Sequence, residues 1–366
     1  MLNRRTVLAT GIGVISTMTA GQKVAAAPSA AAAGFFYPDE ADPHLRTFMQ
    51  WPVNREIHTS AEFLSDLQQS IADIANTIVA FEPVVLLMDK SHVQSARKRL
   101  SSAVEVWEIP TDDLWCRDSG PSFVIDGKGG LAMTQFNFNG WGNKQRHTND
   151  GLVAPRLAER LGLRSFNNGI IGEAGGFEVD GAGTLIAHES SWVNPNRNSG
   201  SKKQVERLLL EAMGAKKIIW APGIKGADIT DYHIDALARF IEPGHVLIQM
   251  GIKVDHADPW SRAAHETHRI LASATDAMGR PMRLTVIPEP VEIRVDTADF
   301  VSSYVNYYVC NGAVIAAEFG DKGTDEKAAT LLAKLYPGRK IVMLNVDPLG
   351  EAGGGIHCAT HEQPKV

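Results

Sequence analysis

The chain has 366 residues, of which 44% are hydrophobic and 21% charged, a composition typical of a globular protein. Its three cysteines do not make a disulfide framework, and no apolar run after the N-terminal segment is long enough to span a membrane. The sequence also has no basic run or aromatic-basic patch of the kind that binds nucleic acid. For the processed chain, these features exclude a membrane span and a disulfide-stapled scaffold, and they predict no nucleic-acid partner.

Residues 1–33 have the pattern of a targeting segment. Arg4 and Arg5 precede a weakly apolar stretch, and small residues of the Ala-x-Ala type follow it. This pattern predicts a twin-arginine export signal and a periplasmic or secreted protein; the alternative is an uncleaved apolar helix. Loss of the three basic residues of this segment, which has no acid, changes the formal net charge from −6 to −9. Such acidity favours a cationic substrate.

Beyond residue 33, helical and extended patterns alternate along the chain. Apolar residues recur with the 3.6-residue period of a helix in four stretches, at 62–80, 201–213, 261–276 and 325–335. A short β-branched run follows each of these helices, at 84–88, 216–220, 283–287 and 340–344. Pairs of extended runs separated by glycine turns, such as 122–136 and 176–188, indicate hairpins.

These elements form five similar units, which open near residues 104, 166, 216, 283 and 340. Repeats this rich in strands usually close into a ring, because one unit cannot bury its faces alone. The fifth unit lacks its last strand, and we expect the apolar stretch at 46–51 to supply it. The sequence therefore predicts an α/β fold, with residues 34–366 forming one domain built as a ring of five units.

The units also share polar residues at corresponding places. A Glu-Ala-Gly-Gly phrase occurs at 173–176 and again at 351–354, and we interpret the two copies as equivalent positions; a coincidence of glycine-rich turns is the alternative. One polar group or more occurs near this place in every unit: Trp115, Arg117 and Asp118, then Glu173, then His233 and Asp235, then Asn306, and finally Cys358. In a ring, these side chains would converge on one axis.

Such a set supports nucleophilic chemistry on a planar cation. A cysteine attacks as its thiolate and usually has a histidine partner, which Cys358 and His233 would provide. Two carboxylates, Asp118 and Asp235, match a guanidinium group, which pairs with carboxylates in bidentate fashion. His233 and Asp235 are two residues apart, so on a strand they would share one face. Singly, each residue also has an ordinary structural interpretation, which we adopt for Cys310 and favour for Cys116.

Seven motifs in order then show a family resemblance. They are WCRDSGPSF, FNFNGWGNK, GEAGGFEVDGAGT, NPNRN, HIDALARF, SYVNYY and GGGIHCAT. Together they resemble the agmatine deiminase family, which includes the Porphyromonas-type peptidylarginine deiminases, from about residue 42 to Cys358. The resemblance implies a five-bladed α/β propeller, the pentein fold, made of ββαβ repeats around a central active site. It implies no metal and no organic cofactor.

The resemblance also implies roles for the site residues. Cys358 attacks the guanidino carbon, Asp118 and Asp235 hold the guanidinium, and His233 moves protons, which gives a thiouronium adduct and then a ureido product. Trp115, Glu173 and Asn306 border the substrate. We interpret His357 as structural, because on a strand it would point away from its neighbour.

Departures from the family pattern surround the expected tail of the substrate. Ile229 stands where an acid is typical, and Tyr232 stands where a glycine is typical; Glu173 could still hold a distal ammonium group. Deimination of a small cationic guanidino compound is therefore predicted more firmly than agmatine as its substrate. A peptidylarginine deiminase, an amidinotransferase and a guanidinium-binding protein without turnover remain alternatives, and a homo-oligomer is possible.

Overall fold

A computed structural model describes residues 28–297 and 299–366. Arg4 and Arg5 of the predicted export signal lie outside the described residues. The end of the predicted signal lies inside them, where the short helix η1 (Ala31–Ala33) follows a fully buried Ala30. Packing of the domain therefore begins at Ala30, slightly before the expected boundary at residue 34. No helix in the described part of the chain is long and apolar enough to cross a membrane.

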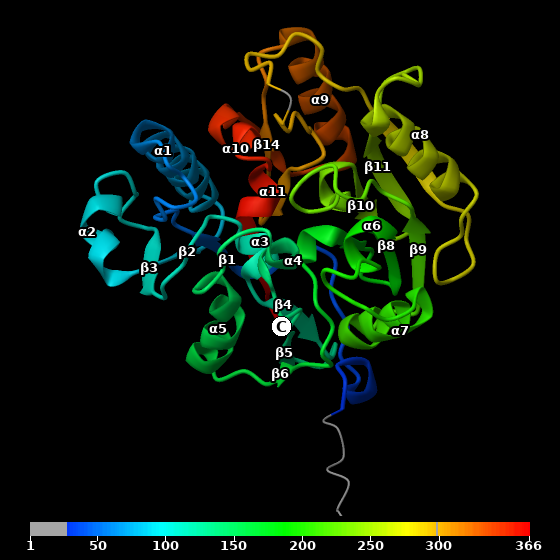
Figure 1. Cartoon of the computed structure of the whole chain (residues 1–366), viewed down its shortest axis with the longest axis horizontal. Helices are drawn as coiled ribbons and strands as arrows, with labels where there is room; N and C mark the ends of the chain where they lie inside the picture. Colours follow the sequence, from blue (N-terminus) through cyan, green and yellow to red (C-terminus); the bar gives the residue numbers. More distant parts are fainter. Residues whose placement is uncertain (1–27, 298) are drawn as a thin grey trace, which may run out of the picture.

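Five small sheets surround a common centre, as the prediction of a ring requires (Figure 1). Four of them have three strands each: β4–β5–β6 (Ser122–Ile125, Leu131–Thr134, Ser165–Phe166), β7–β8–β9 (Phe177–Val179, Thr184–His188, Lys217–Ala221), β10–β11–β12 (Ala238–Glu242, His245–Gln249, Arg283–Ile287) and β13–β14–β15 (Tyr308–Cys310, Ala313–Ala317, Lys340–Leu344). In each, the first two strands are antiparallel and the third lies parallel to the second. A parallel neighbour needs a crossover, which a helix supplies.

The fifth sheet is made from opposite parts of the chain. Its strands are β16 (Thr360–Pro364), β1 (His44–Gln50), β2 (Val84–Met88) and β3 (Glu105–Glu108), in that order. β1 pairs antiparallel with β16, so that Phe48 lies opposite His361, and parallel with β2. The expected closing strand at 46–51 is thus confirmed, although the N-terminal part supplies three strands of this sheet instead of one.

The unit boundaries expected from the sequence are wrong. The strands that were taken to open units, such as 216–220 and 283–287, are β9 and β12, the last strands of their sheets. The physical reason is that the strand after each crossover helix returns to lie beside the strand before that helix. Each ββαβ unit therefore begins with the hairpin, one strand later than expected.

Five longer helices cover the outside of the ring (Figure 1). They are α1 (Ala61–Ile78), α5 (Val153–Leu161), α7 (Lys202–Met213), α8 (Pro259–Ala272) and α9 (Lys322–Leu335). Four were expected; α5 was not, because its nine residues give too short a periodic pattern. Local signals fix the ends: α7, for example, begins with a capping box of Ser201 and Gln204 and ends at Gly214 in the left-handed region.

Shorter elements complete the described chain. They are the α-helices α2 (Val93–Ala96), α3 (Cys116–Ser119), α4 (Gly140–Asn143), α6 (Glu189–Trp192), α10 (Asp347–Glu351) and α11 (Ile356–Ala359), and the 3₁₀ helices η2 (Lys90–His92), η3 (Asp150–Leu152), η4 (Ala174–Gly176) and η5 (Ile234–Ala236). Of these, α3, α4 and α11 lie near the middle of the ring (Figure 1).

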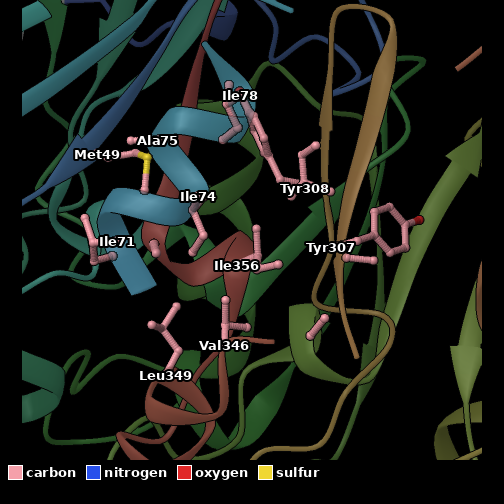
Figure 2. Close-up of a cluster of buried hydrophobic side chains, with 14 of the residues drawn as sticks. Met49, Ile71, Ile74, Ala75, Ile78, Tyr307, Tyr308, Val346, Leu349 and Ile356 are labelled. Carbon is pink, nitrogen blue, oxygen red and sulfur yellow. The ribbon is translucent and has the colours of Figure 1, made fainter. Parts of the chain in front are cut away.

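The largest buried cluster connects the outer helix α1 with the centre. Ile71 and Ile74 on the apolar face of α1 are fully buried in the same cluster as Leu349 of α10 and Ile356 of α11 (Figure 2). Burying an isoleucine side chain contributes about 1.5–3 kcal/mol, so this cluster strongly restrains the elements that share it. It fixes α11, the helix that carries Cys358, against the rest of the fold.

Candidate active site

The expected site residues all lie just before the first strand of a sheet. Asp118 is in α3 before β4, Glu173 precedes η4 and β7, His233 and Asp235 are at η5 before β10, and Asn306 and Cys358 come two residues before β13 and β16. The repeat thus brings one short segment of each sheet to the same end of the axis. The two Glu-Ala-Gly-Gly phrases are not equivalent, however, because Glu351 is exposed in α10, nine residues before its strand.

Gly175 lies at the centre of these segments. A Cβ atom added there would lie 2.6 Å from Nδ1 of His233, 2.9 Å from Oδ1 of Asp118 and 3.1 Å from Oδ2 of Asp235. The absent side chain therefore leaves the space that these three groups face. The thiol of Cys358 borders the same space, with Sγ 3.5 Å from Oδ2 of Asp235.

Asn306 holds the segment that carries the thiol. Its Oδ1 accepts hydrogen bonds from the backbone N–H groups of His357 at 3.0 Å and Cys358 at 3.4 Å, and its Nδ2 lies 3.2 Å from Sγ. A Cβ atom at Gly355 would lie 2.5 Å from Oδ1, so this close approach requires glycine. Trp115 is 8% exposed and closes the neighbouring side, where a Cβ atom at Gly354 would meet its ring.

Glu173 is placed to orient His233. Its two carboxylate oxygens accept from Nε of Arg197 at 2.8 and 2.9 Å, and Oε2 lies 3.1 Å from Nε2 of His233. Arg197 also donates to Oδ2 of Asp231 at 2.7 Å. With both oxygens engaged, Glu173 contacts the histidine instead of offering a free carboxylate to a substrate's tail. Arg197 was not assigned from the sequence, although the motif NPNRN that contains it was recognised.

Burial and like charges shift the pKa values of the carboxyls and the thiol. Burial raises the pKa of Asp118 to about 6, against the lowering effect of His233. Burial also raises the pKa of the Cys358 thiol well above its ordinary value, and the carboxylates of Asp235 and Asp118 raise it further. In the absence of a ligand, the side chain of Cys358 is therefore held as the neutral thiol.

The histidine and the second carboxyl are shifted in the opposite sense. Burial alone would lower the pKa of His233, but the charges of Asp118 and Glu173 raise it to about 9. Burial alone would raise the pKa of Asp235, but the hydrogen bond and charge of His357 outweigh burial and lower it. At neutral pH the site thus presents an imidazolium and an ionised Asp235 beside the thiol.

The backbone before His233 is strained. Asp231 and Tyr232 have φ values of +62° and +72°, in the left-handed region that favours glycine. Tyr232 was expected to border the substrate's tail, but it is 7% exposed and packs edge-on against Trp260, with 4.7 Å between ring centroids. Ile229 is partly buried against the cluster that contains Trp115.

Two local expectations were wrong. His233 and Asp235 do not lie on a strand, because the chain turns as η5 before β10 begins. His357 does not lie on a strand either: it is in α11, and its Nδ1 lies 2.7 Å from Oδ2 of Asp235.

The other two cysteines, Cys116 and Cys310, are fully buried, and burial raises the pKa of both thiols, which agrees with their assignment to the core.

Comparison with known proteins identifies the family. A family model described as Porphyromonas-type peptidyl-arginine deiminase matches residues 36–364. The chain belongs to this family. It is 35% identical over 350 residues to a Streptomyces avermitilis protein provisionally named an agmatine deiminase, a match that covers 92% of this chain and 99% of that protein.

Other relatives support the same membership. The agmatine deiminase of Medicago truncatula is 31% identical over 367 residues, covering 91% of this chain and 97% of the relative. The solved structure of an Enterococcus faecalis agmatine deiminase matches with a TM-score of 0.84 at 27% identity, covering 93% of this chain and 98% of that one. The family resemblance and the five-bladed α/β propeller inferred from the sequence are thereby confirmed.

We expect Gly175→Ala to fold normally but to close the site, because the new methyl group would overlap the space faced by His233, Asp118 and Asp235. The rate at which a cationic haloacetamidine alkylates Cys358, measured by mass spectrometry, should fall by at least about tenfold. Gly323→Ala is the matched control, because a Cβ atom there has its nearest contact at 3.7 Å. Unchanged alkylation of Gly175→Ala would show that ligands do not use this space.

Proposed function

We propose that this protein hydrolyses a guanidino compound to its ureido product and ammonia, with Cys358 as nucleophile. The observation that carries the proposal is Oδ1 of Asp235, which is buried and has no hydrogen-bond partner among the described residues. The other oxygen of this carboxyl lies 3.5 Å from the thiol. A planar cation with several N–H donors would satisfy the unpaired oxygen next to the nucleophile. Guanidinium is such a cation, and the names of the relatives refer to guanidino substrates.

Binding of the cation prepares the nucleophile. The guanidinium lies between Asp118 and Asp235, whose negative charges otherwise oppose ionisation of the thiol. Neutralising these charges lowers the pKa of Cys358, and in the complex the thiol releases its proton to solvent. The substrate thereby creates the thiolate that attacks it. We call this pair of carboxylates the cation clamp. Trp141 fixes one side of it, because its Nε1 donates to Oδ2 of Asp118 at 2.8 Å.

The first half of the reaction expels ammonia. The thiolate of Cys358 adds to the guanidino carbon, forming a C–S bond and a tetrahedral adduct. Protonated His233 donates its proton to one terminal nitrogen, the C–N bond breaks, and ammonia leaves. An S-alkylthiouronium cation remains on the enzyme, and His233 is neutral. Glu173 and Arg197 hold the imidazole in place for this transfer.

The second half restores the thiol. Neutral His233 accepts a proton from water, and the resulting hydroxide adds to the thiouronium carbon. The C–S bond then breaks and the added hydroxyl group loses its proton, which releases the ureido product. This proton converts the returning thiolate to the thiol. The overall balance is one guanidinium and one water converted to one ureido compound and one ammonium ion. The departing ammonia becomes ammonium by taking up a proton from solvent, which balances the proton that the thiol gave up.

The tail of the substrate is less closely specified than its guanidinium. Ile229 offers no charge to a distal amine, and Glu173 is engaged by Arg197 and His233. The ammonium of Lys144 lies near this region, where its Nζ donates to the carbonyl of Ile229 at 3.0 Å and to Oδ2 of Asp231 at 2.8 Å. Agmatine, which carries a second cation, is therefore a weaker fit than a guanidino compound with a neutral tail.

Periplasmic or secreted localisation, a homo-oligomer and the absence of a nucleic-acid partner stay predictions. Export in particular depends on the sequence pattern around Arg4 and Arg5. The family and the geometry of the site are independent of that pattern.

We expect Cys358→Ser to fold like the wild type and to retain less than about 1% of turnover, because a hydroxyl cannot supply the anionic nucleophile. A colorimetric ureido assay against agmatine, free arginine and a peptidylarginine would measure it, with ammonia release followed in parallel. Ammonia release only when an amine is added would indicate an amidinotransferase. Binding of guanidines by wild-type protein without any product would indicate a binding protein, and substantial turnover by Cys358→Ser would contradict the thiouronium route.

We expect kcat/KM to follow a bell-shaped pH profile. It should rise through about pH 6, because the clamp needs Asp118 as carboxylate and its pKa is raised to about 6. It should fall through about pH 9, because ammonia departure needs protonated His233, whose pKa is raised to about 9. Asp118→Asn is the control and should remove the acidic limb from its residual activity. An unchanged acidic limb in this variant would assign the limb to another group.

We expect Ile229→Glu to lower KM for agmatine by about 5- to 30-fold, equivalent to about 1–2 kcal/mol, because the new carboxylate can face the distal amine. KM for a guanidino compound with a neutral tail should not fall. The ammonium of Lys144 is close enough to capture the new carboxylate, so Ile229→Glu should also be measured together with Lys144→Gln. No gain in either background would place the agmatine tail elsewhere.

A further inference from the structure

A cluster of charges, most of them buried, adjoins the candidate site through His357. We call it the axial charge cluster, and its members are Glu40, Arg117, Glu178, Arg239, His357 and Glu362. Glu40 is at its centre: its Oε2 lies 3.1 Å from Nη2 of Arg117, 2.9 Å from Nη2 of Arg239 and 2.9 Å from Nε2 of His357. None of these groups has a part in the reaction steps described above.

The outer members complete the ion pairs. Nη1 of Arg117 lies 2.8 Å from Oε2 of Glu362, and Nε of Arg239 donates to Oε1 of Glu178 at 2.9 Å. The two guanidinium groups are thus shared among three carboxylates. Charges this deeply buried are costly unless each is paired, so the pairing fixes the geometry of the whole cluster.

His357 connects this cluster to the site. One ring nitrogen, Nδ1, lies 2.7 Å from Oδ2 of Asp235, and the other, Nε2, lies 2.9 Å from Oε2 of Glu40. The ring is 2% exposed, and a carboxylate oxygen lies within hydrogen-bond distance of each of its nitrogens. A neutral imidazole can donate from only one nitrogen, whereas a ring that carries both protons donates to both carboxylates. In either form, the two contacts hold the ring between Asp235 and Glu40.

We propose that His357, anchored by Glu40, is the positioning residue that orients the carboxyl group of Asp235 toward the ligand, an inference that rests on the proposed role of Asp235 as a cation clamp. Through the Nδ1 contact, His357 occupies Oδ2 and leaves Oδ1 unpaired toward the ligand. The clamp is then formed before the substrate arrives. Preorganisation of this kind avoids reorganisation at the moment of binding.

The groups around Asp235 support this assignment. His357 and Cys358 contact its Oδ2, Asn306 lies 3.4 Å from its carbonyl oxygen, and the charges of His233 and Arg239 act on it from the neighbouring elements. Of these, His357 has the strongest lowering effect on the pKa of Asp235. Without it, burial would favour the protonated carboxylic acid, which cannot pair with a cation.

The test compares two alkylating reagents of nearly the same shape, cationic 2-chloroacetamidine and neutral 2-chloroacetamide, on Cys358 of the full chain. The ratio of their rates reports whether the clamp attracts a cation, and it does not require turnover. At pH 7 we expect His357→Gln to prefer the amidine about ten- to hundredfold less than the wild type does. This is the size of effect expected from the loss of one charge-assisted hydrogen bond. Glu40→Gln, which keeps an acceptor for Nε2, should reduce it less.

Tyr37→Phe is the matched control. Tyr37 is buried beside the axial charge cluster and its hydroxyl donates to Oε1 of Glu362 at 3.1 Å, but it does not contact His357. We expect this variant to keep the wild-type preference. Thermal unfolding of all variants would check that the fold is intact, and His357→Asn provides a second, smaller replacement should His357→Gln fail to fold.

The pH dependence separates positioning from a purely structural role. His357 lowers the pKa of Asp235, so its removal raises that pKa, and the variant should lose amidine preference as pH falls and regain it as pH rises. A structural defect would instead slow both reagents equally at every pH. That result, or an unchanged preference in His357→Gln, would overturn the proposal.

The same experiment distinguishes this inference from the proposed function. A wild type that prefers the amidine but forms no ureido product would overturn the hydrolase proposal and leave the role of His357 to be decided by the variants. A wild type without any preference would overturn both, because Asp235 would then not be a cation clamp.

Discussion

Pairing of β1 with β16 is the constraint on which the rest of the structure depends. Four sheets are built from consecutive strands, but the fifth is complete only when segments more than 300 residues apart in the sequence come together. Cys358 lies two residues before β16, and Glu40 lies four residues before β1. The hydrogen bonds that close the ring therefore also set the distances between the thiol of Cys358, His357 and the axial charge cluster.

The site combines groups that would not be stable together on their own. Asp118, Asp235 and the thiol share a buried space, and the energetic cost of that burial is visible in the raised pKa values of Asp118 and Cys358. The left-handed backbone at Asp231 and Tyr232 adds local strain. Close packing, such as the cluster shared by α1 and α11, holds these groups in place. A bound cation would relieve the electrostatic part of the energetic cost.

Regular elements could be predicted from the sequence because their signals are local. The long helices show apolar periodicity, as in α1, and glycine turns mark the hairpins, so both were found without reference to the rest of the chain. The short helix α5 was missed, and the unit boundaries were shifted, because only strand pairing shows which strand belongs to which sheet. The convergence of residues such as Asp118 and Cys358 could be predicted because each unit carries a polar residue at a corresponding place.

Other parts of the site depend on contacts that no local pattern encodes. Arg197 reaches Glu173 and Asp231 across two different loops, and Glu40 reaches His357 over 317 positions of sequence. The contact of His357 with Asp235 was not predicted, because the segment was expected to be a strand and is the helix α11 instead. The partners of a buried charge can lie far away in the sequence, so local patterns do not predict them.

Ring closure by the first and last described strands also imposes an order on biosynthesis. β1 is made before every other described strand and must wait, with its edge unpaired, until β16 has been synthesised. Contacts between such distant segments form slowly, so this sheet is the expected late step of folding. The thiol enters its pocket in that same step, because α11 directly precedes β16. A nascent or truncated chain that lacks β16 therefore has neither a closed ring nor an assembled candidate site, and Cys358 reaches its place beside Asp235 only when the ring is complete.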